Sequence, residues 1–432
     1  MTMNRVSRSL VASLLGVMGV CGAFMGEASA QQASKPGEMA IRSQPAFHVS
    51  EENRIRAQAA LTRAHEFLAS QQDKATGGWC IDEKRPNFPA ITALALQGYL
   101  LDPATPMESA LVQDAVKFIL NSQQADGGFY DKILPNYNTA ICISALSKVN
   151  TPQSKEAVKK AVAFLKSLQY GEGAIIQADL GEGAEKVDKD HAFYGGWGYG
   201  KHGRPDMSNT AFAVQALHDA GVDASDASIQ RALVFLQRCQ MAEKADSATG
   251  VITINDMPYA KGSRQGGFVY ATSVNKDQVG SGQSQAAATI EETLDDGTVV
   301  SRLRAYGSMT YAGFKSYLYA NLRADDPRVR LAHEWMMRNY TLDENPGAGT
   351  DGLYYYYLML SRALSAGNIA TIDVKGEGGV KKHEWADELV AKLLTLQNSD
   401  GSFRSVDDRW MEDNPVLITS YSVLALEHAL GR

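Results

Sequence analysis

The chain has little of what would tie it to nucleic acid or to a membrane. Its 49 acidic and 42 basic residues give a formal net charge of −7, so it lacks the basic excess that neutralises phosphates. We therefore expect no nucleic-acid partner. Its apolar run near the N-terminus is shorter than the roughly 20 residues of a membrane-spanning helix. We expect no transmembrane helix in the mature chain.

Common catalytic motifs are also missing. The sequence contains no Gly-x-Ser-x-Gly elbow, P-loop, dinucleotide fingerprint or His-Glu-x-x-His motif. Its histidines show no helical spacing that predicts a metal site. We expect neither a metal nor a cofactor, and the sequence leaves open whether the protein is an enzyme.

The N-terminal segment is typical of export. Basic residues precede an apolar run from Leu10 to Phe24, and small residues follow it up to Ala30. We predict a signal peptide over 1–30 that is cleaved near Ala30, and a periplasmic or extracellular mature protein. The polar stretch 31–50 is predicted to be a disordered lead-in.

Cysteine is sparse. Without Cys21 of the signal peptide, the remaining thiols are Cys80, Cys142 and Cys239. An odd and sparse set does not form a disulfide framework, and the disulfide status of these residues stays open.

What the chain does have is a repeat. A helix ending in Gln is followed by a Gly-x-aromatic turn and an apolar helix; the copies are Gln71–Trp79, Gln124–Phe129, Gln397–Phe403 and a divergent Tyr194–Gly200. Each unit is one helical hairpin that cannot bury its apolar face alone. Stacked hairpins supply that burial.

The helices are of two kinds. Some are amphipathic, with apolar residues at i, i+3, i+4 and i+7, whereas those near 91–100, 139–146, 210–217 and 417–426 are apolar nearly all round. Helices of the second kind must be enclosed. The pattern predicts an all-α fold, a single (α/α)6 toroid of about six hairpins over 51–432.

One segment breaks the repeat. The polar insertion 241–306 alternates around Asp296-Gly297, which predicts a β-hairpin. It is predicted to form a lid over the toroid or a surface that binds a protein partner.

The repeat resembles that of squalene–hopene cyclases, and the hairpin plan resembles the toroids of terpenoid cyclases and protein prenyltransferases. The resemblance covers about Ala57 to Leu430. It implies an α/α toroid with a central cavity for an isoprenoid-type or other hydrophobic small molecule.

The segment Pro205-Asp206-Met207-Ser208-Asn209-Thr210-Ala211 resembles the Pro-Asp-x-Asp-Asp-Thr-Ala motif of those cyclases, but lacks its central acid. The resemblance implies that this acid protonates an alkene. A serine hydroxyl at Ser208 cannot do so, because the reaction requires a strong neutral acid. Orthodox squalene cyclisation is therefore not expected.

The densest group of candidate site residues lies between Asp190 and Asn209. The catalytic candidates are Asp206, His191 and His202, and the ligand-binding candidates are Tyr194, Trp197, Tyr199, Arg204, Asn209 and Tyr311. If the protein is an enzyme, we expect a cyclase-like isomerase or lyase in which Asp206 acts as the acid or base. The structural alternative is that Asp206 caps the following helix and that Trp197 fills a repeat turn.

Two functional alternatives remain. One is a non-enzymatic scaffold of the cell envelope that binds protein partners. The other is a carbohydrate-active, lyase-like toroid in which Arg204 and a histidine converge on the substrate.

Overall fold

Twelve α-helices alternate between an outer and an inner position along the described chain. The outer helices are α1 (Glu51–Gln71), α3 (Ala110–Asn121), α5 (Pro152–Ser167), α7 (Ala227–Cys239), α9 (Pro327–Asn339) and α11 (Trp385–Leu396). The inner helices are α2 (Pro89–Leu101), α4 (Pro135–Leu146), α6 (Met207–Asp219), α8 (Gly307–Tyr319), α10 (Leu353–Ala366) and α12 (Pro415–Ala429).

The computed structural model describes residues 45–432 except 83, 85, 177–184, 201–202, 274–282, 377 and 406. The expected signal peptide lies outside these residues. None of the helices described is long and apolar enough to cross a membrane.

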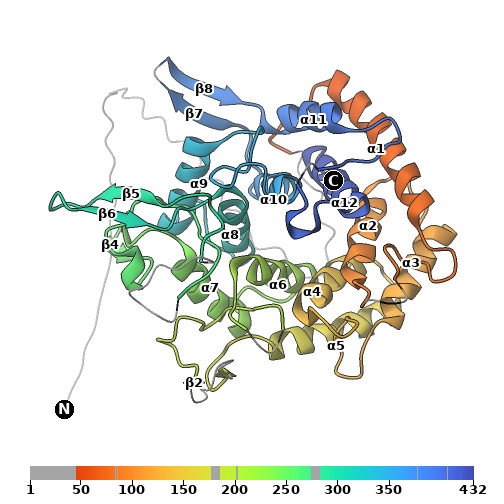
Figure 1. Ribbon diagram of the computed structural model, residues 1–432, viewed down its shortest axis with the longest axis horizontal. Coiled ribbons are helices and arrows are strands. Elements are labelled where there is room, and N and C mark those ends of the chain that lie inside the picture. The colour runs from red at the N-terminus through yellow and green to blue at the C-terminus, as the bar shows by residue number, and fades with distance from the viewer. Residues whose placement is uncertain are drawn as a thin grey trace, which may run out of the picture. The chain divides into compact units, whose positions relative to one another are not determined.

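The inner helices close a ring. Each packs on the next in the order α2, α4, α6, α8, α10 and α12, and α12 packs back on α2; Figure 1 looks down this ring, with the outer helices around it. The inner helices are buried almost along their whole length, as at Ala90–Tyr99 of α2. This agrees with their lack of a polar face, and the predicted α/α toroid of six hairpins is confirmed.

The repeated glutamine ties neighbouring outer helices together. Its side-chain amide donates to the carbonyl of the repeat glycine and to a carbonyl of the next outer helix. The five pairs of acceptors are Gly77 and Leu111 for Gln72, Gly127 and Ala157 for Gln123, Gly195 and Ser228 for Gln169, Gly266 and Arg328 for Gln240, and Gly401 and Ala60 for Gln397. The last pair closes the outer ring between α11 and α1.

Two details differ from the sequence-based repeat. The bonding glutamines are Gln72 and Gln123, not their neighbours Gln71 and Gln124, because only these amides face the next hairpin. A further copy joins Gln240 to Phe268 across part of the insertion. The sequence-based repeat did not include it, because Gly266 and Phe268 lie within the predicted insertion 241–306.

The aromatic residue of each turn enters the core and is held by a threonine of the inner helix. The backbone N–H of Trp79, Phe129, Trp197, Phe268 and Phe403 donates to the hydroxyl of Thr92, Thr139, Thr210, Thr310 and Thr419, respectively, at 2.9–3.0 Å. The repeat glycine is required by space: Gly195 has φ +87°, and a Cβ there would lie 1.9 Å from the Arg231 carbonyl oxygen.

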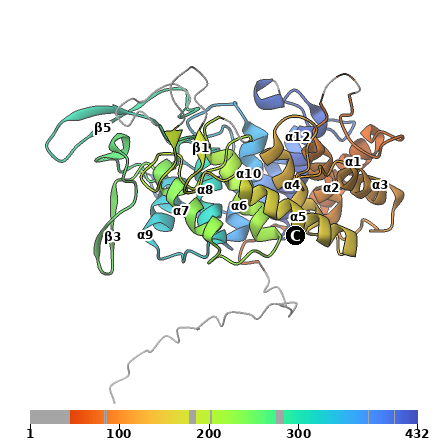
Figure 2. The same ribbon diagram turned by 90° about the horizontal axis from the view of Figure 1, so that it is seen from below.

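Short antiparallel β-hairpins lie in the loops between the helices. They are β1 (Ile175–Ile176) with β2 (Glu185–Lys186), β3 (Lys244–Ser247) with β4 (Gly250–Thr253), β5 (Ile290–Thr293) with β6 (Val299–Arg302), and β7 (Ile372–Gly376) with β8 (Gly379–His383). The third pair confirms the hairpin predicted around Asp296-Gly297, with Thr293 opposite Val299. Figure 2 shows β3 and β5 at the rim of the ring, and both belong to the insertion between α7 and α8.

The packed chain begins before the expected boundary at residue 51. Phe47 and Val49 are buried, and the Phe47 ring lies 4.8 Å from that of Trp385 at the start of α11. The end of the predicted lead-in 31–50 is therefore part of the fold, because two of its apolar residues are buried in the core. Cys80, Cys142 and Cys239 are free thiols.

Candidate functional site

A cavity of about 360 Å³ lies where the N-terminal ends of the six inner helices converge. Its walls are mostly aromatic and aliphatic: Phe88, Ile91, Leu134, Tyr137, Tyr199, Phe212, Tyr270, Tyr306, Met309, Tyr355, Trp410, Met411, Leu417 and Tyr421. The polar lining residues are Ser208, Asn209, Ser308 and Glu412. The volume falls within the roughly 300–1,000 Å³ of small-molecule pockets.

Asp206 lies beside this cavity but is not among its lining residues. It is the N-cap of α6, and its Oδ1 and Oδ2 accept from the backbone N–H and the side-chain amide of Asn209, both at 2.8 Å. Burial raises the pKa of the Asp206 carboxyl to about 6, against the lowering effect of these bonds and of Arg204. Both oxygens are thus engaged in holding the start of α6.

Asn209 carries the polar network from Asp206 to the cavity. It lines the cavity, and its Oδ1 accepts from the side-chain amide of Asn136 on α4 at 3.0 Å. Ser208, which stands where the related motif has its acid, places its hydroxyl 3.1 Å from that of Tyr355 on α10. This hydroxyl pair binds α6 to α10 across the cavity wall.

Tyr199 and Arg204 lie at the same end of the ring. Tyr199 lines the cavity, and its hydroxyl is 3.4 Å from the hydroxyl of Tyr270, another lining residue. The guanidinium of Arg204 lies over the Tyr270 ring, 6.0 Å from its centroid. The structure therefore brings Tyr199, Arg204, Asp206 and Asn209 together.

The other candidates are placed elsewhere. His191 accepts at Nδ1 from the Phe193 N–H, and its Nε2 is 3.3 Å from a carboxylate oxygen of Glu185, outside the cavity lining. Tyr194 is buried in a cluster under the insertion. His202 lies outside the described residues.

Trp197 and Tyr311 are core residues. The Trp197 indole donates to the Leu165 carbonyl at 2.8 Å, as the Trp79 indole donates to that of Leu68. The Tyr311 ring packs edge-on against Tyr356, 5.6 Å between centroids. Neither lines the cavity.

Glu412 is the acid that sequence reasoning missed. It follows the short helix η2 (Arg409–Met411), is 1% exposed and lines the cavity. Its Oε1 accepts from the Tyr355 N–H at 3.1 Å. Burial raises its pKa to about 7, opposed by backbone N–H groups at the start of α10. No motif marks Glu412, since it stands in an irregular loop, and its one signal is an acid close to the start of an apolar helix.

Polar side chains fill the ring toward the C-terminal ends of the inner helices. Lys315 is fully buried and donates to the Gln215 side-chain carbonyl at 2.8 Å, and Arg362 donates to Gln97 and His428. Burial lowers the pKa of Lys315 to about 7, helped by the charge of Arg362. This cluster occupies the inside of the ring beyond the aromatic cavity.

One group of described residues has the composition of a metal site. His65, Asp102 and Glu427 are buried and offer ligand atoms within 4.8 Å of one another. The Arg432 guanidinium lies 3.7 Å from Asp102 and 3.1 Å from Glu427. Because the Arg432 guanidinium already pairs with both carboxylates, the cluster is explained as a charge network.

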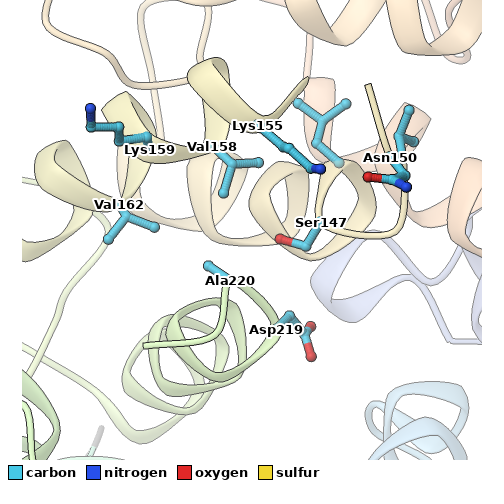
Figure 3. A pocket seen from close by; sticks show the side chains of 10 residues that line it. Ser147, Asn150, Lys155, Val158, Lys159, Val162, Asp219 and Ala220 are labelled. Carbon is cyan, nitrogen blue, oxygen red and sulfur yellow. The ribbon is translucent and has the colours of Figure 1, made fainter. Parts of the chain in front are cut away.

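A second hollow, of about 430 Å³, lies outside the ring. It is bordered by α5 and by the C-terminal ends of α4 and α6, and Figure 3 shows Ser147, Val158 and Ala220 around it. Lys155 and Lys159 on its edge are exposed. It is a surface groove between hairpins, far along the helices from the aromatic cavity.

Part of the chain matches the model of a known protein family. Residues 92–251 match the family model of the squalene-hopene cyclase C-terminal domain. No curated protein matches the chain. Among solved structures, type II terpene cyclase MstE from Scytonema is similar at 14% identity and a TM-score of 0.47, over 87% of this chain and 99% of that one.

A carbohydrate-active protein is similar to the same degree. An inactive variant of the alpha-1,6-mannanase of Salegentibacter sp. HEL1_6, in complex with alpha-1,6-mannotriose, matches at 11% identity and a TM-score of 0.48, over 87% of this chain and all of that one. The closed double ring of helices makes the chain an α/α toroid, and its residues 92–251 are similar to the squalene-hopene cyclase C-terminal domain.

Proposed function

We propose that this protein binds an isoprenoid-type or similar hydrophobic small molecule in the cavity at the N-terminal ends of the inner helices. The observation that carries the proposal is the lining: fourteen of the eighteen residues that border the cavity are aromatic or aliphatic. Burying apolar ligand surface against such walls yields roughly 25 cal/mol for each Å² removed from water.

The walls also suit an unsaturated ligand. Tyr137, Phe212, Tyr355 and Tyr421 form connected ring contacts with centroids 5.5–6.0 Å apart. Alkenes and methyl branches pack well on such aromatic faces, and the faces attract positive charge.

The lyase-like alternative required Arg204 and a histidine to converge on one point. Arg204 lies over the Tyr270 ring, and His191 accepts from the Phe193 N–H and lies 3.3 Å from Glu185. Neither residue is among those lining the cavity. The described residues therefore favour the hydrophobic ligand over a uronic-acid polymer.

The test uses a reporter that the chain already contains. Of its five tryptophans, Trp410 is 43% exposed and lines the cavity, whereas Trp79, Trp197, Trp335 and Trp385 are buried in the core. We expect farnesol to change the intrinsic fluorescence of the delipidated protein in a saturable manner. A Trp410→Phe variant should lose that change.

Two matched variants locate the binding. Ser208→Phe adds a ring inside the cavity and should weaken farnesol binding at least tenfold, which follows from loss of roughly 1.4 kcal/mol or more. Ser225→Phe places the same ring on an exposed loop and should leave it unchanged. Equal affinity in both variants, or no saturable signal, would argue against the proposal. Mannooligosaccharide binding in the same assay would favour the carbohydrate alternative.

The protein-binding alternative stays a prediction for the insertion 241–306. Mass spectrometry of extracts of the mature protein from its native compartment distinguishes the ligand-binding proposal from the protein-binding alternative. A stoichiometric hydrophobic molecule supports the cavity, whereas a repeatedly empty protein with a co-purifying partner supports the scaffold.

A further inference from the structure

Glu412 lines the cavity, and its two carboxyl oxygens differ in their hydrogen-bond partners. The side chain is 1% exposed, and Oε1 accepts from the Tyr355 N–H at 3.1 Å. Its Oε2 is buried and has no hydrogen-bond partner among the described residues. A buried oxygen without a partner is costly, at roughly 1–3 kcal/mol, so a ligand atom is the partner that this geometry lacks.

The position of the Glu412 side chain is set by its contact with α10 and by the backbone conformation just before it. Helix α10 starts after Gly352, whose lack of a side chain leaves the first N–H groups uncapped. Glu412 supplies the missing acceptor from another part of the chain. Just before it, Trp410 and Met411 have φ of 57° and 67°, a conformation that costs non-glycine residues about 1–3 kcal/mol each and persists only where the surroundings impose it.

The fixed position decides which oxygen carries the proton. Oε1 faces backbone donors and must act as an acceptor, so the proton of a neutral carboxyl resides on Oε2. Among the described residues, those that interact electrostatically with Glu412 include Asp407 and the phenols of Tyr354, Tyr357 and Tyr421. The charge of Asp407 adds to burial in favouring the neutral form.

We propose that Oε2 of Glu412 is the polar anchor of the cavity and donates a hydrogen bond to an oxygen atom at the end of a hydrophobic ligand. The ligand class is thus narrowed to isoprenoid-type molecules with a carbonyl or hydroxyl group, in preference to hydrocarbons. This inference rests on the proposed function, since it assigns a head group to the same bound molecule.

Asp206 does not compete for this role. Both of its oxygens already accept from Asn209, and it is not among the lining residues. Three other polar lining residues have partners: Ser208 pairs with Tyr355, and Ser308 and Asn209 accept from asparagine side chains. Among the described lining residues, Glu412 Oε2 is a buried polar atom that remains open to a ligand.

The first arm of the test compares farnesol with the C15 hydrocarbon farnesene by Trp410 fluorescence. We expect the wild type to prefer farnesol about tenfold, the effect of one added hydrogen bond in a buried site. Glu412→Met should abolish the preference while still binding farnesene. Glu412→Gln, which keeps an N–H donor at the same place, should retain much of it.

The second arm uses geranylacetone, a ketone that can only accept a hydrogen bond. Its affinity for the wild type should fall about tenfold from pH 6 to pH 8, because the protonated fraction of a group with a pKa of about 7 falls in that ratio. Glu412→Gln should bind the ketone equally at both pH values. The Asp206 carboxyl also titrates, but it is present in the wild type and in Glu412→Gln. A difference between the two proteins in the pH dependence of ketone affinity therefore comes from Glu412.

The outcomes separate the two proposals. Equal binding of farnesol and farnesene by wild type and Glu412→Met, with no pH dependence for the ketone, overturns the Glu412 inference and leaves the proposed function intact. If no probe binds, both fail. Circular dichroism checks the fold of each variant; if Glu412→Met does not fold, the pH comparison between wild type and Glu412→Gln decides alone.

Discussion

Replacing Glu412 with glutamine should stabilise the empty protein at alkaline pH. Burial raises the pKa of this carboxyl from an ordinary value of 4.5 to about 7. A raised pKa of an acid means that its favourable contribution to stability is fully present below pH 4.5 and is lost as the pH rises through 7. Above pH 7 the folded wild type must hold an ionised carboxylate in a cavity lined mostly by apolar groups.

The magnitude follows from the pKa change. The rise from 4.5 to about 7, at about 1.4 kcal/mol for each pKa unit, corresponds to about 3 kcal/mol at pH 8 or above. Glu412→Gln removes the charge but keeps an oxygen that can accept from the Tyr355 N–H. The variant should therefore match the wild type near pH 4 and exceed it by up to about 3 kcal/mol at pH 8.

The assay is thermal unfolding of both ligand-free proteins at pH 4, 6 and 8. The difference in midpoint should grow with pH, by a few degrees in favour of the variant. The exposed Glu156→Gln on α5 is the charge-matched control and should show no such growth. A variant that is less stable than the wild type at pH 8, or a difference that does not change with pH, would refute the reasoning about Glu412.

Two further predictions concern the scaffold. Gln240→Met removes an amide that donates to two backbone carbonyls and accepts from a buried tyrosine hydroxyl. Because these groups lose their partner, the free energy of unfolding measured by calorimetry should fall by about 2–4 kcal/mol. The control Gln153→Met, at an exposed position, should leave it almost unchanged. Phe47→Ala should lower it by about 3 kcal/mol through the cavity left on the outer ring, whereas the 62%-exposed Ile55→Ala should cost far less. An unchanged midpoint in Phe47→Ala would mean that the segment before α1 does not stabilise the toroid.

The candidate site was only partly accessible from the sequence. The likeness of Asp206–Asn209 to an acidic motif led to the right end of the ring, since Asn209 lines the cavity and Asp206 lies beside it. The same segment also contains Trp197 and Tyr194, which the fold buries elsewhere. Sequence proximity could not separate these residues, because a loop of irregular conformation turns its side chains in several directions.

The scaffold of this protein can be predicted from its repeating sequence pattern. Its glutamine, glycine, aromatic and threonine positions recur because five of the six hairpins make the same local contacts with the next one, so the pattern repeats along the chain. The place of a single residue within the ring, by contrast, depends on contacts between segments far apart in the sequence. Glu412 reaches the start of α10 from 57 residues away in the chain, and only the closed ring brings it there, with one oxygen accepting from α10 and the other without a partner among the described residues.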